Sequence, residues 1–187
     1  DVLTMSEGES GMSVSGPFAS GVPTDDNNLV ARALRLCGKT AHVHIEKNIP
    51  HGGGLGGGSA DAAAVLRWAS YSDLVAASRL GADIPFCMHG GRARVTGIGE
   101  ILQPLPFVAR AITLVVPPFG VSTPAVYKAF DSLQEHSDGP NDLEPAAIAV
   151  EPRLALWRDR IREASGQSPV LAGSGATWWL DGTHPRI

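Results

Sequence analysis

The sequence has little cysteine, no long apolar run and no cluster of basic residues. Its two cysteines, Cys37 and Cys87, do not form a C-x-x-C pair. We therefore expect free thiols in a reducing cytoplasm. No apolar run approaches the roughly 18 residues of a membrane-spanning helix. Residues 1–8 lack the basic start and apolar core of a signal peptide, so we expect neither membrane insertion nor export.

The charge pattern excludes further classes. The net charge is −4, and the 15 Lys and Arg residues are dispersed, which argues against a nucleic-acid surface. His42 and His44 alternate along one strand, but no Cys, Asp or Glu follows at a convincing ligand spacing, so a zinc site is not expected. With 43% apolar residues, the 187-residue chain can bury the core of one domain or of two small ones.

Periodicity predicts an α+β chain without internal repeats. Helices are expected over residues 29–37, from Ser59, and over 73–80, 123–133 and 152–164. Strands are expected at 12–15, 41–46, 85–89, 93–96, 101–105, 111–116 and 177–180, with 111–116 buried because it is almost continuously apolar. The polar stretch 135–140 is expected to be a loop, and a weak domain boundary is expected near residues 104–110.

The strongest local signal is a glycine-rich loop between an amphipathic strand and an alanine-rich helix. Six glycines occupy the seven positions 52–58. Without Cβ atoms, their N–H groups can approach a ligand closely. Ser59 is expected to cap the following helix, whose N-terminus attracts anions. The loop thus predicts a phosphate cradle, although it matches neither a Walker A loop nor a clean dinucleotide fingerprint.

Two shorter segments are ambiguous when read alone. In Leu80-Gly-Ala-Asp-Ile-Pro-Phe86, Pro85 disfavours helix at Ile84, so Asp83 is expected on a sharp turn. An aspartate there is either a plain turn residue or a carboxylate that projects into a cleft. Leu171-Ala-Gly-Ser-Gly-Ala-Thr177 is a glycine turn that could equally be a simple hairpin.

Together these motifs resemble those of the GHMP kinases, a superfamily named for galactose, homoserine, mevalonate and phosphomevalonate kinases. Pro50-x-Gly-x-Gly-Leu-Gly-Gly-Gly-Ser-Ala-Asp-Ala-Ala resembles the central ATP-binding motif, and Gly-Ala-Asp-Ile-Pro resembles the catalytic aspartate motif. The resemblance implies that Asp83 is the general base and that Ser59 lies near bound Mg²⁺. The implied ATP-binding residues are Pro50, His51, Gly52, Gly53, Gly54, Leu55, Gly56, Gly57, Gly58, Ser59 and Ala60.

The resemblance also extends to substrate residues. Glycine turn 171–177 resembles the third family motif, in which Gly173, Ser174 and Gly175 would approach the substrate. Residues 118–127 and the doubled glycines resemble a branch whose small-molecule substrate carries a cytidine diphosphate. Tyr127 would then stack on cytosine, and Lys47 would serve nucleotide or substrate phosphates. Read without the resemblance, Tyr127 is a half-buried helix residue and Lys47 a solvated strand end.

The implied architecture is the two-domain GHMP fold. Residues 1–108 would form the N-terminal ATP-binding domain, incomplete at its start, and residues 109–187 a ferredoxin-like C-terminal domain, incomplete at its end. We expect an ATP- and Mg²⁺-dependent kinase acting on the 2-hydroxyl of the cytidine diphosphate substrate, as a monomer or homodimer. The family's Pro-Gly-Lys strand and Gly-Tyr-His turn have no match here, and the link at 67–71 is short. Two alternatives therefore stay open: a homoserine- or mevalonate-type kinase, and a non-catalytic nucleotide-binding remnant.

Overall fold

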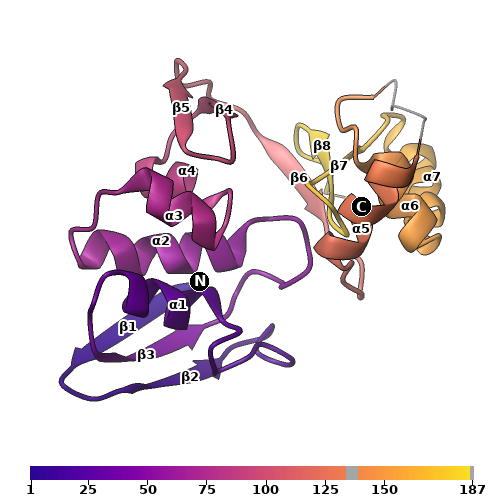
Figure 1. The fold of residues 1–187 in the computed structure, drawn as a ribbon. Helices are drawn as coiled ribbons and strands as arrows, with labels where there is room; N and C mark the ends of the chain where they lie inside the picture. The colour runs from indigo at the N-terminus through magenta and orange to yellow at the C-terminus, as the bar shows by residue number, and fades with distance from the viewer. Residues whose placement is uncertain (134–138, 186–187) are drawn as a thin grey trace. The chain divides into compact units, whose positions relative to one another are not determined.

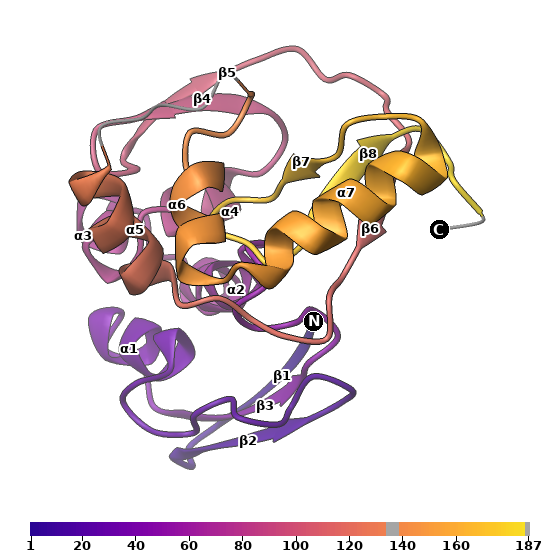
Figure 2. The same cartoon turned by 90° about the vertical axis from the view of Figure 1, so that its right-hand side faces the viewer.

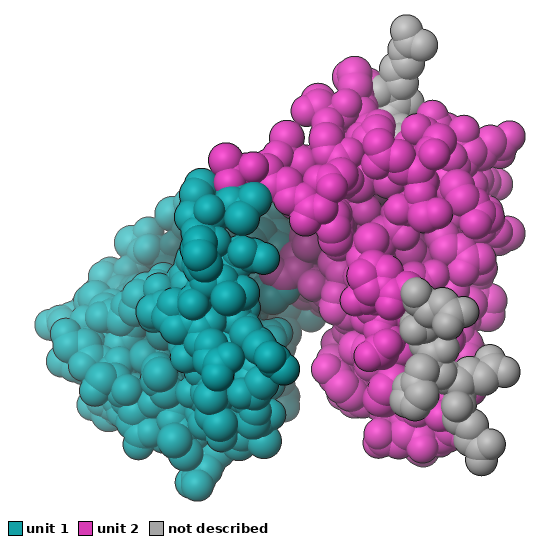
Figure 3. Space-filling view, turned by 90° about the horizontal axis from the view of Figure 1, so that it is seen from above, with its two compact units in different colours: residues 1–49, 56–108 teal, residues 50–55, 109–187 magenta. Residues whose placement is uncertain are grey.

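The computed structural model describes residues 1–133 and 139–185. These form two compact units, which Figure 3 shows in different colours. The first unit contains residues 1–49 and 56–108, and the second contains 50–55 and 109–187. The chain therefore leaves the first unit within the glycine-rich loop, contributes six residues to the second, and then returns.

The sheet of the first unit has three strands in the order β1-β3-β2. They are β1 (Val2–Glu7), β2 (Gly11–Ser15) and β3 (Ala41–Glu46). The central strand β3 pairs antiparallel with β1 and parallel with β2. Alternation along β3 points Ala41, Val43 and Ile45 into the core and leaves His42 and His44 on the other face.

The helices of the first unit stack on one face of that sheet (Figures 1 and 2). They are α1 (Leu29–Leu36), α2 (Gly57–Trp68), α3 (Leu74–Leu80) and α4 (Ile84–His89). Helix α2 lies at the centre of the core because it packs against both α1 and α4. Its alanines allow close approach, while Val65 and Leu66 fill the interior. The hairpin of β4 (Ala93–Thr96) and β5 (Ile101–Pro104) completes the unit.

The second unit is an antiparallel sheet with helices packed on it. The strands β6 (Ile112–Val115), β8 (Trp178–Asp181) and β7 (Val170–Leu171) lie in the order β6-β8-β7. The helices are α5 (Thr123–Ser132), α6 (Glu144–Val150) and α7 (Arg153–Ser165). Trp178 is fully buried at the centre of this core, with Leu154 and Leu180. Strand β8 begins at this buried tryptophan, so the core anchors the chain directly after the glycine turn 171–177.

Most expected elements are present, and the expectations for two strands were wrong. Residues 85–89, expected as a strand, lie in helix α4, because Pro85 occupies the first turn, where no intrahelical N–H donor is needed. The expected burial of 111–116 also fails: Ile112 and Leu114 are 50% and 45% exposed on β6. Of the expected loop 135–140, residues 135–138 lie outside the described residues. No helix in the described ranges is long and apolar enough to cross a membrane.

Candidate phosphate-binding and catalytic site

The first half of the glycine-rich loop is held by backbone hydrogen bonds within the second unit. The carbonyl of Gly52 accepts from the N–H groups of Val121 and Ala176, at 3.0 and 3.1 Å. The carbonyl of Gly53 accepts from the N–H of Thr177 at 3.1 Å. The loop is therefore joined to the glycine turn 171–177. A free glycine linker would make no such bonds.

Two glycines of the loop have different physical roles. Both have positive φ, +73° at Gly54 and +67° at Gly56. A Cβ at Gly54 would lie 1.9 Å from the carbonyl oxygen of Ala172, so any side chain there would collide with the glycine turn. A Cβ at Gly56 would meet nothing within 4 Å. Gly54 thus allows the loop to dock, whereas Gly56 keeps the space beside the backbone open.

Helix α2 begins earlier than the sequence predicted. It starts at Gly57 with Gly56 as its N-cap, so Ser59 lies inside the first turn and was wrongly expected to be the cap. The first N–H groups of a helix have no intrahelical partner, and the helix dipole favours anions there. The surface at Gly58 is also open, because a Cβ built there would meet only the Leu29 side chain, at 3.9 Å. The first residues of α2, Gly57 to Ser59, therefore offer donors, and Gly56 and Gly58 leave space, for an anionic ligand.

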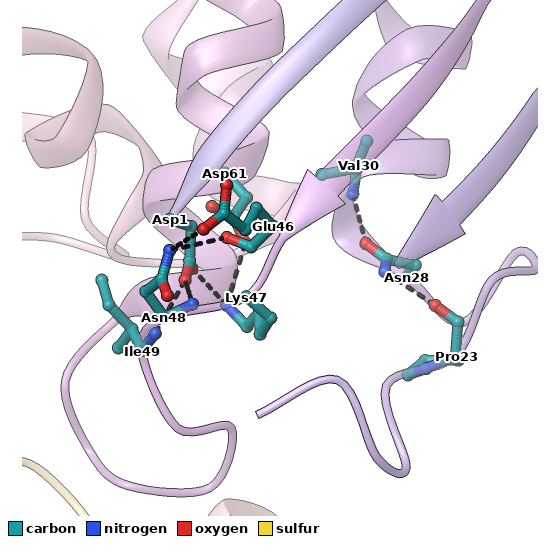
Figure 4. Close-up of polar contacts among 9 residues, drawn as sticks. All are labelled: Asp1, Pro23, Asn28, Val30, Glu46, Lys47, Asn48, Ile49 and Asp61. Carbon is teal, nitrogen blue, oxygen red and sulfur yellow. Dashed lines mark hydrogen bonds and ion pairs between the residues drawn. The ribbon is translucent and has the colours of Figure 1, made fainter. Parts of the chain in front are cut away.

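Lys47 is buried between two carboxylates rather than solvated at a strand end (Figure 4). Only 3% of it is exposed, and its Nζ donates to Asp61 at 2.9 Å and also to Asp1. Asp1 additionally accepts from the N–H groups of Asn48 and Ile49, at 2.6 and 2.7 Å. This cluster fastens the chain just before Pro50 to helix α2 and to the start of β1.

The partners of Lys47 were not identified from the sequence. Asp61 interrupts an alanine-rich helix at a position that faces the core, and a buried carboxylate needs a paired charge. That mismatch was the available signal. Its partners could not be inferred, because Lys47 lies on the other side of the glycine-rich loop and Asp1 lies at the start of the chain, just before β1.

Asp83 is exposed and immediately precedes α4. It occupies the N-cap position, but its carboxylate makes no capping hydrogen bond to the helix. The expectation that Pro85 disfavours helix at Ile84 was wrong here, since Ile84 is the first helical residue. A Cβ at Gly99 would lie 1.9 Å from the carbonyl oxygen of Ala82, so the β4–β5 turn packs directly against the peptide before Asp83. The carboxylate thus projects from a supported turn.

The charge of Asp83 reaches the helix that follows it. Burial raises the pKa of the Cys87 thiol, and the neighbouring Asp83 carboxylate raises it further, while Arg67 opposes the shift. Arg67 also donates to the Cys87 carbonyl. A raised pKa keeps this thiol neutral and a poor nucleophile. Cys87 is therefore best described as a packing residue of α4.

The glycine turn 171–177 is closed by its own backbone and by side chains. Ala172 N–H donates to the Thr177 carbonyl at 2.8 Å, and Gly175 N–H to the Ala172 carbonyl at 2.9 Å. The Ser174 hydroxyl is 2.8 Å from that of Thr123 at the start of α5, and Ser174 is only 6% exposed. Gly173 is exposed and Gly175 buried, so these two flank Ser174 in different surroundings.

Tyr127 lies on α5, four residues after Thr123, and is 52% exposed. It is thus a helix residue with about half of its surface open to solvent, which agrees with a half-buried helix residue and also leaves the side chain accessible to a ligand. Within residues 1–133 and 139–185, no three His, Cys, Asp or Glu side chains gather as a metal-binding group. Mg²⁺ commonly keeps few protein ligands and uses phosphate oxygens instead.

The roles of the two glycines can be separated by alanine substitution. Gly54→Ala combines a collision with Ala172 and a strained φ, so we expect a loss of about 3 kcal/mol or more in the free energy of unfolding. Gly56→Ala meets no atom and adds only the strain, about 1–2 kcal/mol. Urea denaturation of both variants measures the difference. Equal losses would contradict the docking role of Gly54.

The buried charges give a second prediction. Lys47→Met leaves two buried carboxylates without a cation, so we expect a loss of about 3–5 kcal/mol in unfolding free energy. The matched control is Lys39→Met: Lys39 lies on the surface, 5.8 Å from the centre of the Trp68 ring. We expect it to cost less than about 1 kcal/mol. The role assigned to Lys47 fails if both variants unfold at the same denaturant concentration.

Comparison with known proteins agrees with these motifs. The family described as "GHMP kinases N terminal domain" matches residues 28–91. The 4-diphosphocytidyl-2-C-methyl-D-erythritol kinase of Paracoccus denitrificans is 41% identical over 200 residues, covering 95% of this chain and 72% of the relative. The kinase of the same name from Cereibacter sphaeroides (strain ATCC 17029) is 40% identical, covering 89% of this chain and 70% of the relative.

Solved structures give the same assignment. A crystal structure of 4-(cytidine 5'-diphospho)-2C-methyl-D-erythritol kinase matches with a TM-score of 0.65 and 31% identity, covering 95% of this chain and 75% of the other. Homoserine kinase from Cytophaga hutchinsonii matches with a TM-score of 0.60 and 15% identity, covering 98% and 76%, a likeness that concerns the fold alone. The chain belongs to the GHMP kinase superfamily and, within it, to the 4-diphosphocytidyl-2-C-methyl-D-erythritol kinase family.

Proposed function

We propose that this protein transfers the γ-phosphoryl group of ATP to the 2-hydroxyl of 4-diphosphocytidyl-2-C-methyl-D-erythritol, in the non-mevalonate route to isoprenoid precursors. The observation that carries the kinase activity is the glycine loop, which opens helix α2 with free space at Gly56. The substrate rests on relatives about 40% identical that bear this enzyme's name. We further propose that the two units are the N- and C-terminal domains of the family.

The loop and the first turn of α2 would hold the phosphates of ATP. The first half of the loop is held by the bonds of Gly52 and Gly53 to the glycine turn, and the first residues of α2, Gly57 to Ser59, present N–H groups without an intrahelical partner. The Ser59 hydroxyl lies half-buried in that turn and offers the type of oxygen ligand that Mg²⁺ prefers. When bound with the phosphates, Mg²⁺ would neutralise their charge and orient them. These residues therefore fit both ATP and its metal ion.

Asp83 would accept the proton of the substrate hydroxyl. In the transfer, the hydroxyl oxygen forms a bond to the γ-phosphorus, the bond to the ADP oxygen breaks, and the hydroxyl proton moves to the Asp83 carboxylate. The carboxylate suits this role because it is exposed and is not used to cap α4. The packing of Gly99 on Ala82 holds its backbone in place.

Substrate recognition would come mainly from the second unit. The exposed Tyr127 can stack on cytosine, since stacking on a base needs only an accessible aromatic face. Gly173, Ser174 and Gly175 would present their backbone to the substrate. Lys47 would act chiefly by fixing the start of the loop, because its ammonium already serves Asp1 and Asp61. Contact between Lys47 and a phosphate would require the exchange of one carboxylate partner.

The function is tested by a coupled assay that follows ADP release from ATP and Mg²⁺. The acceptors are 4-diphosphocytidyl-2-C-methyl-D-erythritol, homoserine and mevalonate, offered separately. We expect turnover with the cytidine substrate alone. Turnover with homoserine or mevalonate would assign another GHMP kinase activity. ATP binding by equilibrium titration without turnover on any acceptor would instead identify a non-catalytic nucleotide-binding protein.

Replacement of the proposed base should separate chemistry from binding. For Asp83→Asn we expect kcat to fall by roughly 10²–10⁴-fold, while the Kd for ATP stays within about twofold. The control is Asp73→Asn, because Asp73 caps α3 by accepting from the Ala76 N–H at 2.9 Å, and asparagine keeps that acceptor. Its kcat should equal that of the unmodified protein. An Asp83→Asn enzyme with undiminished kcat would remove the general-base role.

A further inference from the structure

One side chain from outside the glycine turn 171–177 makes two hydrogen bonds to its backbone. The Nδ2 group of Asn141 donates to the carbonyl oxygens of Leu171 and Gly173, both at 2.8 Å. These carbonyls lie on either side of Ala172, whose own carbonyl faces Gly54. One amide group therefore spans the part of the turn that contacts the glycine-rich loop.

Asn141 is itself firmly held. Its Oδ1 accepts from the Leu143 N–H at 3.0 Å, and its backbone carbonyl accepts from the Glu144 N–H at 3.1 Å. These bonds fix it immediately before α6, whose Ala146 and Ala147 are fully buried in the core of the second unit. The side chain thus links a rigid helix start to the glycine turn.

Any displacement of the turn 171–177 would move the glycine-rich loop, because the two backbones are in direct contact. The turn donates from Ala176 and Thr177 to the carbonyls of Gly52 and Gly53, both at 3.1 Å. At Gly54 the fit leaves no space even for a Cβ. A shift of a few tenths of an ångström at Leu171 or Gly173 would therefore move the loop that is proposed to hold the phosphates.

We propose that Asn141 is a positioning residue for the phosphate loop and acts through the turn 171–177. The inference rests on the proposed function for the identity of the ligand, though not for the mechanical link. The chemistry requires a side chain with two N–H donors and an acceptor, which an amide supplies in this compact form. An aspartate of the same shape would keep the acceptor for Leu143 but direct a carboxylate oxygen at two carbonyl oxygens.

The test compares Asn141→Asp with Asp142→Asn. Asp142 is the exposed neighbour of Asn141. Its variant also exchanges a carboxylate and an amide, in the opposite direction, at a side chain that is exposed. We expect Asn141→Asp to raise the Kd and KM for ATP about tenfold or more. Asn141→Ser, which keeps an acceptor and one donor, should give an intermediate value. Asp142→Asn should leave both constants unchanged.

A readout that needs no ATP separates this proposal from the proposed function. Amide hydrogen exchange measured by NMR should speed up at Ala176 and Thr177 in Asn141→Asp, relative to the core amide of Leu180. Unchanged exchange at both amides, or an unchanged KM for ATP in the folded variant, would overturn the positioning role. If Asn141→Asp does not fold, Asn141→Ser decides by the same two measurements. If the unmodified protein itself binds no ATP, faster exchange in Asn141→Asp would still confirm the link between Asn141 and the loop, while the kinase assignment would be rejected.

Discussion

The structure depends on the absence of one side chain at the contact between two glycine segments. At Gly54 the backbone lies against the carbonyl of Ala172, closer than any Cβ would permit. The adjacent carbonyls of Gly52 and Gly53 are then in reach of N–H groups from Val121, Ala176 and Thr177. These bonds make residues 50–55 part of the second compact unit, although the chain on both sides belongs to the first.

Electrostatics secures the other side of the same loop. Lys47 and Asp61 lie before and after it in the sequence, and their buried ion pair joins the two ends. Burial of charged groups is costly unless they are paired and hydrogen-bonded, and Asp1 supplies further bonds to the backbone of Asn48 and Ile49. The loop is thus fastened by charge at its base and by backbone bonds at its first half. Its second half, at Gly56, stays open for a ligand.

Much of the fold could be predicted because its signals are local. The alternation of residues 41–46 and the helical spacing of Val30, Ala33 and Leu34 report burial directly, and both elements form as expected. Residues 85–89 were misassigned because their apolar run fits a short strand or a short helix equally well. The packing of α4 against α2 resolves that ambiguity. The expected burial of strand β6 was wrong for a similar reason. Apolar residues alone do not reveal whether other elements cover both faces of a strand, and one side of β6 is half-exposed.

The sequence by itself determined the family and the kinds of residues in the site. Glycine spacing, the aspartate before Ile-Pro and the second glycine turn are contiguous patterns, and backbone freedom is a property of the residue itself. Only the tertiary structure decided how these parts are held. The role of Gly54 depends on Ala172, that of Lys47 on Asp61 and that of Asn141 on Leu171. Each of these pairs is joined by folding rather than by sequence proximity, so no local pattern could have specified them.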